Sequence, residues 1–81
     1  MARYYFHLRD GGELVTDDEG VDLPDLSAAK REAIQAAREL LADAIRAGKT
    51  RVPEAYVIAD EAGRALETIH LASILPEPLK R

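Results

Sequence analysis

Apolar and polar side chains alternate along residues 3–9, close to the start of the chain. One side of this stretch carries Tyr4, Phe6 and Leu8, and the other carries Arg3, Tyr5, His7 and Arg9. A period of two is typical of a strand with one buried face. Asp10-Gly11-Gly12 follows, and these residues tolerate the positive φ of a tight turn. We therefore predict a hairpin whose return strand covers residues 13–16.

An acidic stretch separates this hairpin from the next pattern. Residues 17–20, Asp-Asp-Glu-Gly, have turn composition, and residues 21–23 suit a brief third strand. An EF-hand loop fails here: with Gly20 at its sixth position, Val15 would be first and Leu26 twelfth, where calcium needs carboxylates. We interpret the acidic residues as turn formers and a helix cap.

A long helix is predicted over residues 26–47, which contain no glycine or proline and are rich in strong helix formers. Asp25 is suited to cap its start, and Gly48 to end it as the C-cap. Apolar residues at helical spacing define a face that we expect to pack on the sheet: Leu26, Ala29, Ala33, Ala37, Leu40 and Ala44.

A second apolar ridge, made of Ile34, Leu41 and Ile45, lies beside that face. It widens the apolar arc of the helix to roughly 180°. The loop after Gly48 or the C-terminal segment could cover this ridge, or a second subunit could do so. The sequence leaves both alternatives open, and the three ridge residues are the candidate interface.

The second half of the chain predicts another hairpin. Residues 54–60 and 64–71 have strand composition around a turn at 61–63, and residues 72–75 suit one helical turn. Either Leu66, Thr68 and His70 or Ala65, Ile69 and Leu71 face inward. The expected fold is α+β with the order ββ(β)αββ, a small, mainly antiparallel sheet of four or five strands with one long helix on one face. A single domain would cover residues 1–75, with a C-terminal tail at 76–81.

Composition narrows the function classes. The 81 residues include no cysteine, which excludes disulfides, thiolate metal sites and cysteine nucleophiles. The formal charge of −4 argues against general nucleic-acid binding, which needs unopposed basic side chains. No apolar run approaches the roughly 20 residues that span a bilayer, and the N-terminus lacks a signal-peptide pattern. We expect a cytoplasmic protein that inserts into no membrane.

Candidate chemistry is sparse. His7 and His70 have no second ligand at metal-binding spacing, and no serine or threonine lies in a nucleophile motif. The glycines form no phosphate-binding loop. We predict no enzyme, no catalytic residue, no metal and no cofactor. The outer side of the first strand, with Tyr5, His7 and Arg9, is the candidate binding surface, because aromatic and basic side chains interleave there.

The stretch RYYFHLRDGGELVTDDEGVDLPDLSAAKREAIQAARELL resembles a family of short bacterial proteins of unknown function. In that family an Arg-Tyr-Phe/Tyr-Phe-His-Leu/Val-Arg-Asp/Asn-Gly opening precedes an Asp-Glu-Glu-Gly turn and an alanine-rich helix. VIADEAGRALETI is similar to the family's second signature. The resemblance implies no activity. It places these residues at signature positions: Phe6, His7, Arg9, Asp10, Gly11, Gly20 and Gly63.

A looser similarity links GVDLPDLSAAKREAIQAARELL to HicB-type antitoxins, which have a strand, an acidic turn, Pro-Asp-Leu and then a helix. Two functional hypotheses result. The first is a non-enzymatic protein-interaction module that self-associates as a homodimer or other homo-oligomer, with room for a further protein partner. The alternative is a HicB-antitoxin-like regulator that binds a toxin partner or nucleic acid.

Overall fold

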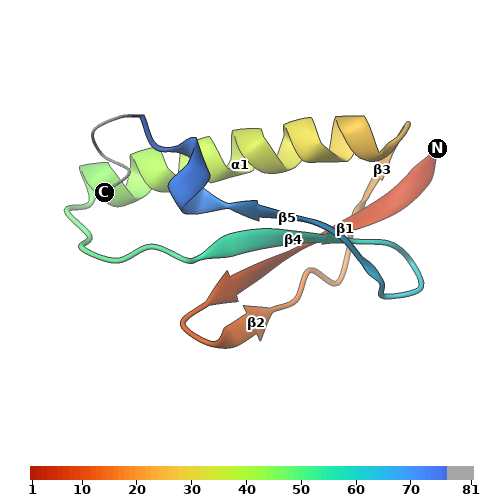
Figure 1. Cartoon of the computed structure of the whole chain (residues 1–81), viewed down its shortest axis with the longest axis horizontal. Helices are drawn as coiled ribbons and strands as arrows, with labels where there is room; N and C mark the ends of the chain where they lie inside the picture. Colours follow the sequence, from red (N-terminus) through yellow and green to blue (C-terminus); the bar gives the residue numbers. More distant parts are fainter. Residues whose placement is uncertain (77–81) are drawn as a thin grey trace.

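A long helix lies along one face of an antiparallel sheet of five strands (Figure 1). The computed structural model describes residues 1–76 of the chain. Its elements are β1 (Ala2–Asp10), β2 (Glu13–Val15), β3 (Val21–Leu23), α1 (Leu26–Arg46), β4 (Ala55–Ala59), β5 (Ala65–His70) and the 3-10 helix η1 (Leu71–Ile74). The predicted α+β order is confirmed, and the short third strand is formed. The predicted tail, from residue 77 onward, lies outside the described residues.

The first strand is the centre of the sheet, whose strand order is β2-β1-β4-β5 with β3 also paired to β1. Leu8 lies opposite both Val15 of β2 and Tyr56 of β4, so β2 and β4 occupy opposite edges of β1. The other end of β1, residues 2–4, pairs with β3. β1, with nine residues, pairs with three other strands. Its two edges therefore determine where β2, β3 and β4 lie in the sheet.

Local chemistry fixes the start of α1. The Oδ1 atom of Asp25 accepts a hydrogen bond from the Ala28 backbone N–H at 2.9 Å, which satisfies one of the donors left free in the first turn. The predicted N-cap is therefore confirmed.

The helix ends one residue earlier than predicted. Its C-cap is Ala47, and Gly48 follows with φ 70°. The N–H groups of Gly48 and Lys49 donate to the carbonyls of Ile45 and Ala44, at 3.1 and 2.9 Å. This is the Schellman arrangement, in which the glycine takes the left-handed conformation just beyond the cap.

The core lies between α1 and the sheet in two clusters. One contains Tyr4, Ala29, Ala33 and Ile58, and the other contains Ala37, Leu41 and Leu71. The helix contributes mostly alanines to this layer, and Ala29, Ala33 and Ala37 have no exposed surface. Small side chains let the helix approach the sheet closely, and the volume of each site is then tightly constrained.

The second apolar ridge of α1 is only partly covered. Leu41 is 8% exposed and packs with Leu71 in the second core cluster, which Ile74 and Leu75 also contact. The C-terminal segment therefore covers Leu41, and the expectation that Leu41 belongs to an interface between subunits does not fit this burial. Ile34 is half-buried and Ile45 remains 67% exposed.

The inward face of β5 is now assigned. Ile69 packs against the first core cluster, and Glu67 forms an ion pair with Lys30 of the helix at 3.3 Å. Thr68 and His70 alternate with these residues and lie on the other face. The sequence left two sets of inward side chains open on this strand. A register shift between Ile58 and Ala59 interrupts the alternation there, so a strict period of two could not distinguish the sets.

We expect Ala33→Leu to lower the free energy of unfolding by about 1–3 kcal/mol, because the larger side chain must force the helix away from the sheet. Ala42→Leu is the matched control, since position 42 lies about 180° away around the helix and is half-exposed. Urea unfolding of both variants checks this. Equal losses at the two positions would contradict the close packing.

Candidate functional site

The three predicted binding residues Tyr5, His7 and Arg9 lie on the sheet face opposite the helix. Phe6 between them lies opposite Ile58, whose side chain is in the core beneath α1. The rings of Tyr5 and His7 stack with their centroids 6.4 Å apart. Arg9 is exposed, whereas Tyr5 and His7 are half-buried.

The two histidines lie on this same face but in different rows of the sheet. His7 is in register with Val57 and Thr68, and His70 is in register with Ala55, with β4 between β1 and β5. The sheet therefore does not bring the two imidazoles together. Among residues 1–76, no group of three or more histidine, aspartate or glutamate side chains is arranged to hold a metal ion.

A loop of residues 16–20, which we call the clasp loop, covers part of this surface and is held by one carboxylate. The Oδ2 atom of Asp17 accepts a hydrogen bond from the Phe6 backbone N–H at 3.1 Å. Its Oδ1 atom accepts from the N–H groups of Glu19 and Gly20, both at 3.2 Å. Both oxygens of Asp17 are thus used, one to bind β1 and the other to shape the loop.

His7 of β1 also binds the clasp loop. Its Nδ1 atom accepts a hydrogen bond from the backbone N–H of Asp17 at 3.0 Å. An imidazole nitrogen can accept only when it carries no proton, so this contact requires the tautomer with the proton on Nε2. The side chain expected on an exposed strand face is therefore half-buried and fixes a loop.

Arg3 holds the far end of the clasp loop. Its Nη1 atom donates to the Glu19 carbonyl at 2.6 Å. Its Nε and Nη2 atoms reach the two carboxylate oxygens of Asp22 at 3.1 and 3.2 Å. This paired geometry orients the guanidinium group and joins β1 to β3 beyond the hydrogen bonds of the strands.

Both the space around position 20 and its backbone conformation require glycine there. Its φ is 71°, and a Cβ atom placed on it would lie 2.9 Å from both Arg3 Cγ and Tyr5 Cε2, and 3.0 Å from the Tyr4 carbonyl oxygen. No other amino acid can bring the loop this near to β1 without displacing the strand.

The hydrogen bonds also change the acidity of Asp17. Partial burial alone would raise the pKa of this carboxyl group, but the hydrogen bonds from the N–H groups of Phe6, Gly20 and Glu19 outweigh burial. The pKa of Asp17 therefore lies below its ordinary value of 3.8. The ionised form is the one that holds the loop.

A family model described as "Domain of unknown function (DUF6894)" matches residues 3–72 of the chain. The chain belongs to this family. The match begins at Arg3 and ends within η1, so it covers the helix and all strand residues except Ala2. The resemblance to a family of unknown function is thus confirmed. No curated protein and no solved structure matches the chain.

Two expected signature residues of the DUF6894 chain, His7 and Gly20, meet at the clasp loop. Asp17 was interpreted only as a turn former, and its bond to Phe6 was missed. A sequence clue was present: an aspartate three residues before a glycine can accept the glycine's N–H. No local pattern indicated that the Asp17 side chain would bind Phe6, eleven residues earlier in β1.

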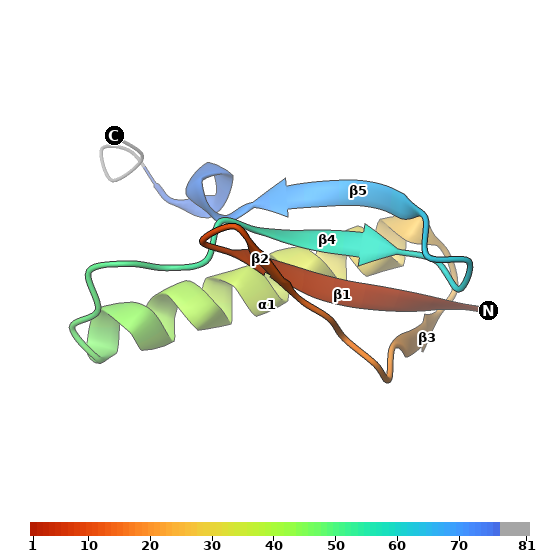
Figure 2. The same ribbon diagram turned by 90° about the horizontal axis from the view of Figure 1, so that it is seen from below.

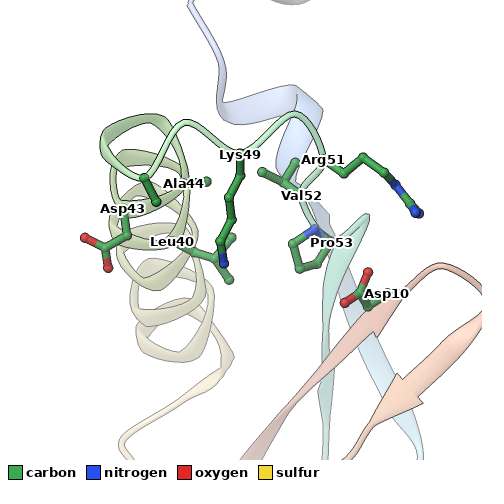
Figure 3. Close-up of a pocket in the computed structure, with 9 residues that line it drawn as sticks. Asp10, Leu40, Asp43, Ala44, Lys49, Arg51, Val52 and Pro53 are labelled. Atoms are coloured by element: carbon green, nitrogen blue, oxygen red, sulfur yellow. The ribbon is translucent and has the colours of Figure 1, made fainter.

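A surface cavity of about 550 Å³ lies at the end of α1, away from the clasp loop (Figure 3). The loop after the helix, the tip of β1 and the last helical turn surround it. Its lining residues are Asp10, Leu40, Asp43, Ala44, Ala47, Lys49, Arg51, Val52 and Pro53. Lys49 extends across the hollow, whereas Arg51 and Asp43 turn outward (Figure 3). Its charged groups are exposed and of both signs, so they favour no single class of ligand.

We expect Gly20→Ala to destabilise the protein more than Gly63→Ala does. Both glycines have positive φ, but a Cβ atom on Gly63 meets nothing within 4 Å. Gly63→Ala should therefore lower the unfolding free energy by about 1 kcal/mol, and Gly20→Ala by about 1–3 kcal/mol more because of the clash. Thermal or urea unfolding checks the difference. Equal losses of unfolding free energy in the two variants would mean that Gly20 does not lie close enough to β1 for a Cβ atom to clash.

Acid should weaken the clasp loop. Because the pKa of Asp17 is lowered in the folded chain, its bonds contribute stability above about pH 4, and this contribution is lost as the pH falls further. Asp17→Asn should lower the unfolding free energy at pH 7 by about 1–3 kcal/mol and reduce its fall on acidification. Asp18→Asn, next to it on the exposed surface, is the control and should behave like the wild type. Urea unfolding across this pH range tests both.

Proposed function

We propose that this DUF6894 protein is a non-enzymatic interaction module that associates with copies of itself. The observation that carries the proposal is the uncovered remainder of the apolar ridge on α1. Ile45 is 67% exposed and Ile34 half-buried, on the flank of the helix that faces β5. An apolar flank of this kind is covered in many proteins by a second subunit.

The contacts of Lys30 and Leu41 show on which side of α1 this flank lies. Lys30 reaches Glu67 of β5, and Leu41 packs against Leu71, which follows β5. Ile34 and Ile45 lie within about 60° of Lys30 around the helix. They therefore face the β5 end of the sheet. A shallow hollow of about 460 Å³ lies next to Ile34, and its other lining residues are Arg31, Glu32, Gln35 and Arg38.

The hydrogen bonds that Asp17 and His7 already make support a role without catalysis. A general acid or base needs a polar atom free to meet a substrate. Both carboxylate oxygens of Asp17 already accept backbone hydrogen bonds, and the Nδ1 atom of His7 accepts another, so that Nε2 is the one ring nitrogen not bound to the clasp loop. These groups therefore serve the structure of the clasp loop.

The other expectations stay predictions. No helix among residues 1–76 is long and apolar enough to cross a membrane, and a cytoplasmic location remains an expectation. The HicB-like alternative, with a toxin partner or nucleic acid, likewise has no contact in the structure that favours it.

Ile34→Glu tests the self-association. The new carboxylate should form a favourable pair with Arg38 four residues later, so the monomer should keep its fold, while the charge should disrupt an apolar interface. We expect the wild type to be a dimer or larger oligomer by native mass spectrometry and the variant to be largely monomeric. Leu14→Glu is the control, because Leu14 is 47% exposed on β2, away from α1. A monomeric wild type would overturn the proposal.

A further inference from the structure

We infer that two copies of this chain join edge to edge through β5, so that one continuous sheet runs across both. The inference rests on the proposed self-association and specifies its geometry. It concerns the free backbone edge of β5, which the proposed function does not use.

The outer edge of β5 has no partner strand in the described part of the chain. β5 ends the strand order, and within residues 1–76 no strand pairs with its outer side (Figure 2). Alternate residues of Ala65–His70 thus direct backbone N–H and C=O groups outward in a row, and at the end of the strand the His70 carbonyl also accepts from the Ser73 hydroxyl at 2.7 Å. Such an edge is a template for another strand. The opposite edge of the sheet is interrupted by the clasp loop and carries only three-residue strands.

Symmetry restricts how two β5 strands can pair. In an antiparallel pair related by a two-fold axis normal to the sheet, one residue lies opposite its own copy. For a six-residue strand, overlap is greatest when that residue is Glu67 or Thr68. Centring on Glu67 would place two carboxylates directly opposite one another, which is destabilising. Centring on Thr68 places two threonines together, a favourable cross-strand pair.

The Thr68 register also suits the remaining side chains. Glu67 then lies opposite Ile69 of the second copy and keeps its ion pair with Lys30 of its own helix. The two-fold axis leaves both helices on the same face of the joined sheet. Their flanks at Ile34 turn toward the axis, because that flank lies on the β5 side of α1. One geometry therefore uses both the free backbone edge and the uncovered apolar ridge.

Thr68→Cys tests the register directly, since the chain contains no native cysteine. Opposed Cβ atoms in such a pair lie about 4.5–5.5 Å apart, within reach of a short bismaleimide and, at the lower end of that range, of a disulfide. We expect the larger part of this variant to become a covalent dimer on mild oxidation or cross-linking. Val15→Cys, 55% exposed on the opposite edge, is the control and should remain uncoupled.

The outcomes of native mass spectrometry and of cross-linking distinguish β5 pairing from self-association in general. A native dimer that cross-links at position 68 and not at position 15 supports both. A native dimer that fails to cross-link at position 68, with circular dichroism showing a folded variant, overturns β5 pairing while self-association stands. A wild-type monomer, or one bound only to a different protein, overturns both.

Hydrogen exchange of the wild type provides a measurement without substitution. On raising the protein concentration through the dimerisation range, the outward N–H groups of residues 65–70 should exchange at least about tenfold more slowly. The amides of β2 serve as the internal reference and should not change. Unchanged exchange in β5 across that range would overturn the pairing even if Thr68→Cys does not fold.

Discussion

One carboxylate completes the edge of the strand on which the whole sheet is built. β1 is paired with β2 at one end and β3 at the other, and between them the Phe6 N–H would have no strand partner. Asp17 supplies the acceptor. A buried backbone donor without a partner is costly, so this side chain takes the place of a missing strand. Because the same carboxylate also binds Glu19 and Gly20, the loop and the edge are held together.

The arrangement gives a physical meaning to His7 and Gly20, two residues expected at signature positions of the family. His7 receives the N–H of Asp17, Arg3 binds the Glu19 carbonyl, and Gly20 passes within contact distance of β1. A set of polar residues in one place often indicates an active site. Here Nδ1 of His7 and Nη1 of Arg3 contact the backbone of the chain itself. The parts of the molecule left open to partners are elsewhere, along β5 and the flank of α1.

Local patterns in the sequence were sufficient for most of the fold. Alternation along residues 3–9 identified which side of β1 is buried, and the position of Asp25 identified the start of the helix. Both features depend on neighbours a few residues apart. The burial of Leu41 could not be settled in this way, because it depends on η1, thirty residues later. The sequence indicated the width of the apolar arc but not which segment would cover it.

The candidate site was less predictable than the fold for the same reason. Tyr5, His7 and Arg9 were placed on the correct face, but the half-burial of His7 depends on a loop whose path is set by Asp17. A turn composition predicts that the chain reverses; it does not predict which distant donor the turn will reach. Residues 21–23 were expected to form a brief strand, but their composition did not indicate that β1 would be its partner.

The most direct measurement is a nuclear magnetic resonance titration of the Asp17 carboxyl carbon together with the amide protons of Phe6, Glu19 and Gly20. The account predicts that the pKa of Asp17 lies below its ordinary value of 3.8 and that the three amides shift with the same midpoint, because one ionised group accepts from all of them. An ordinary pKa for Asp17, with amides that do not follow its titration, would contradict the account.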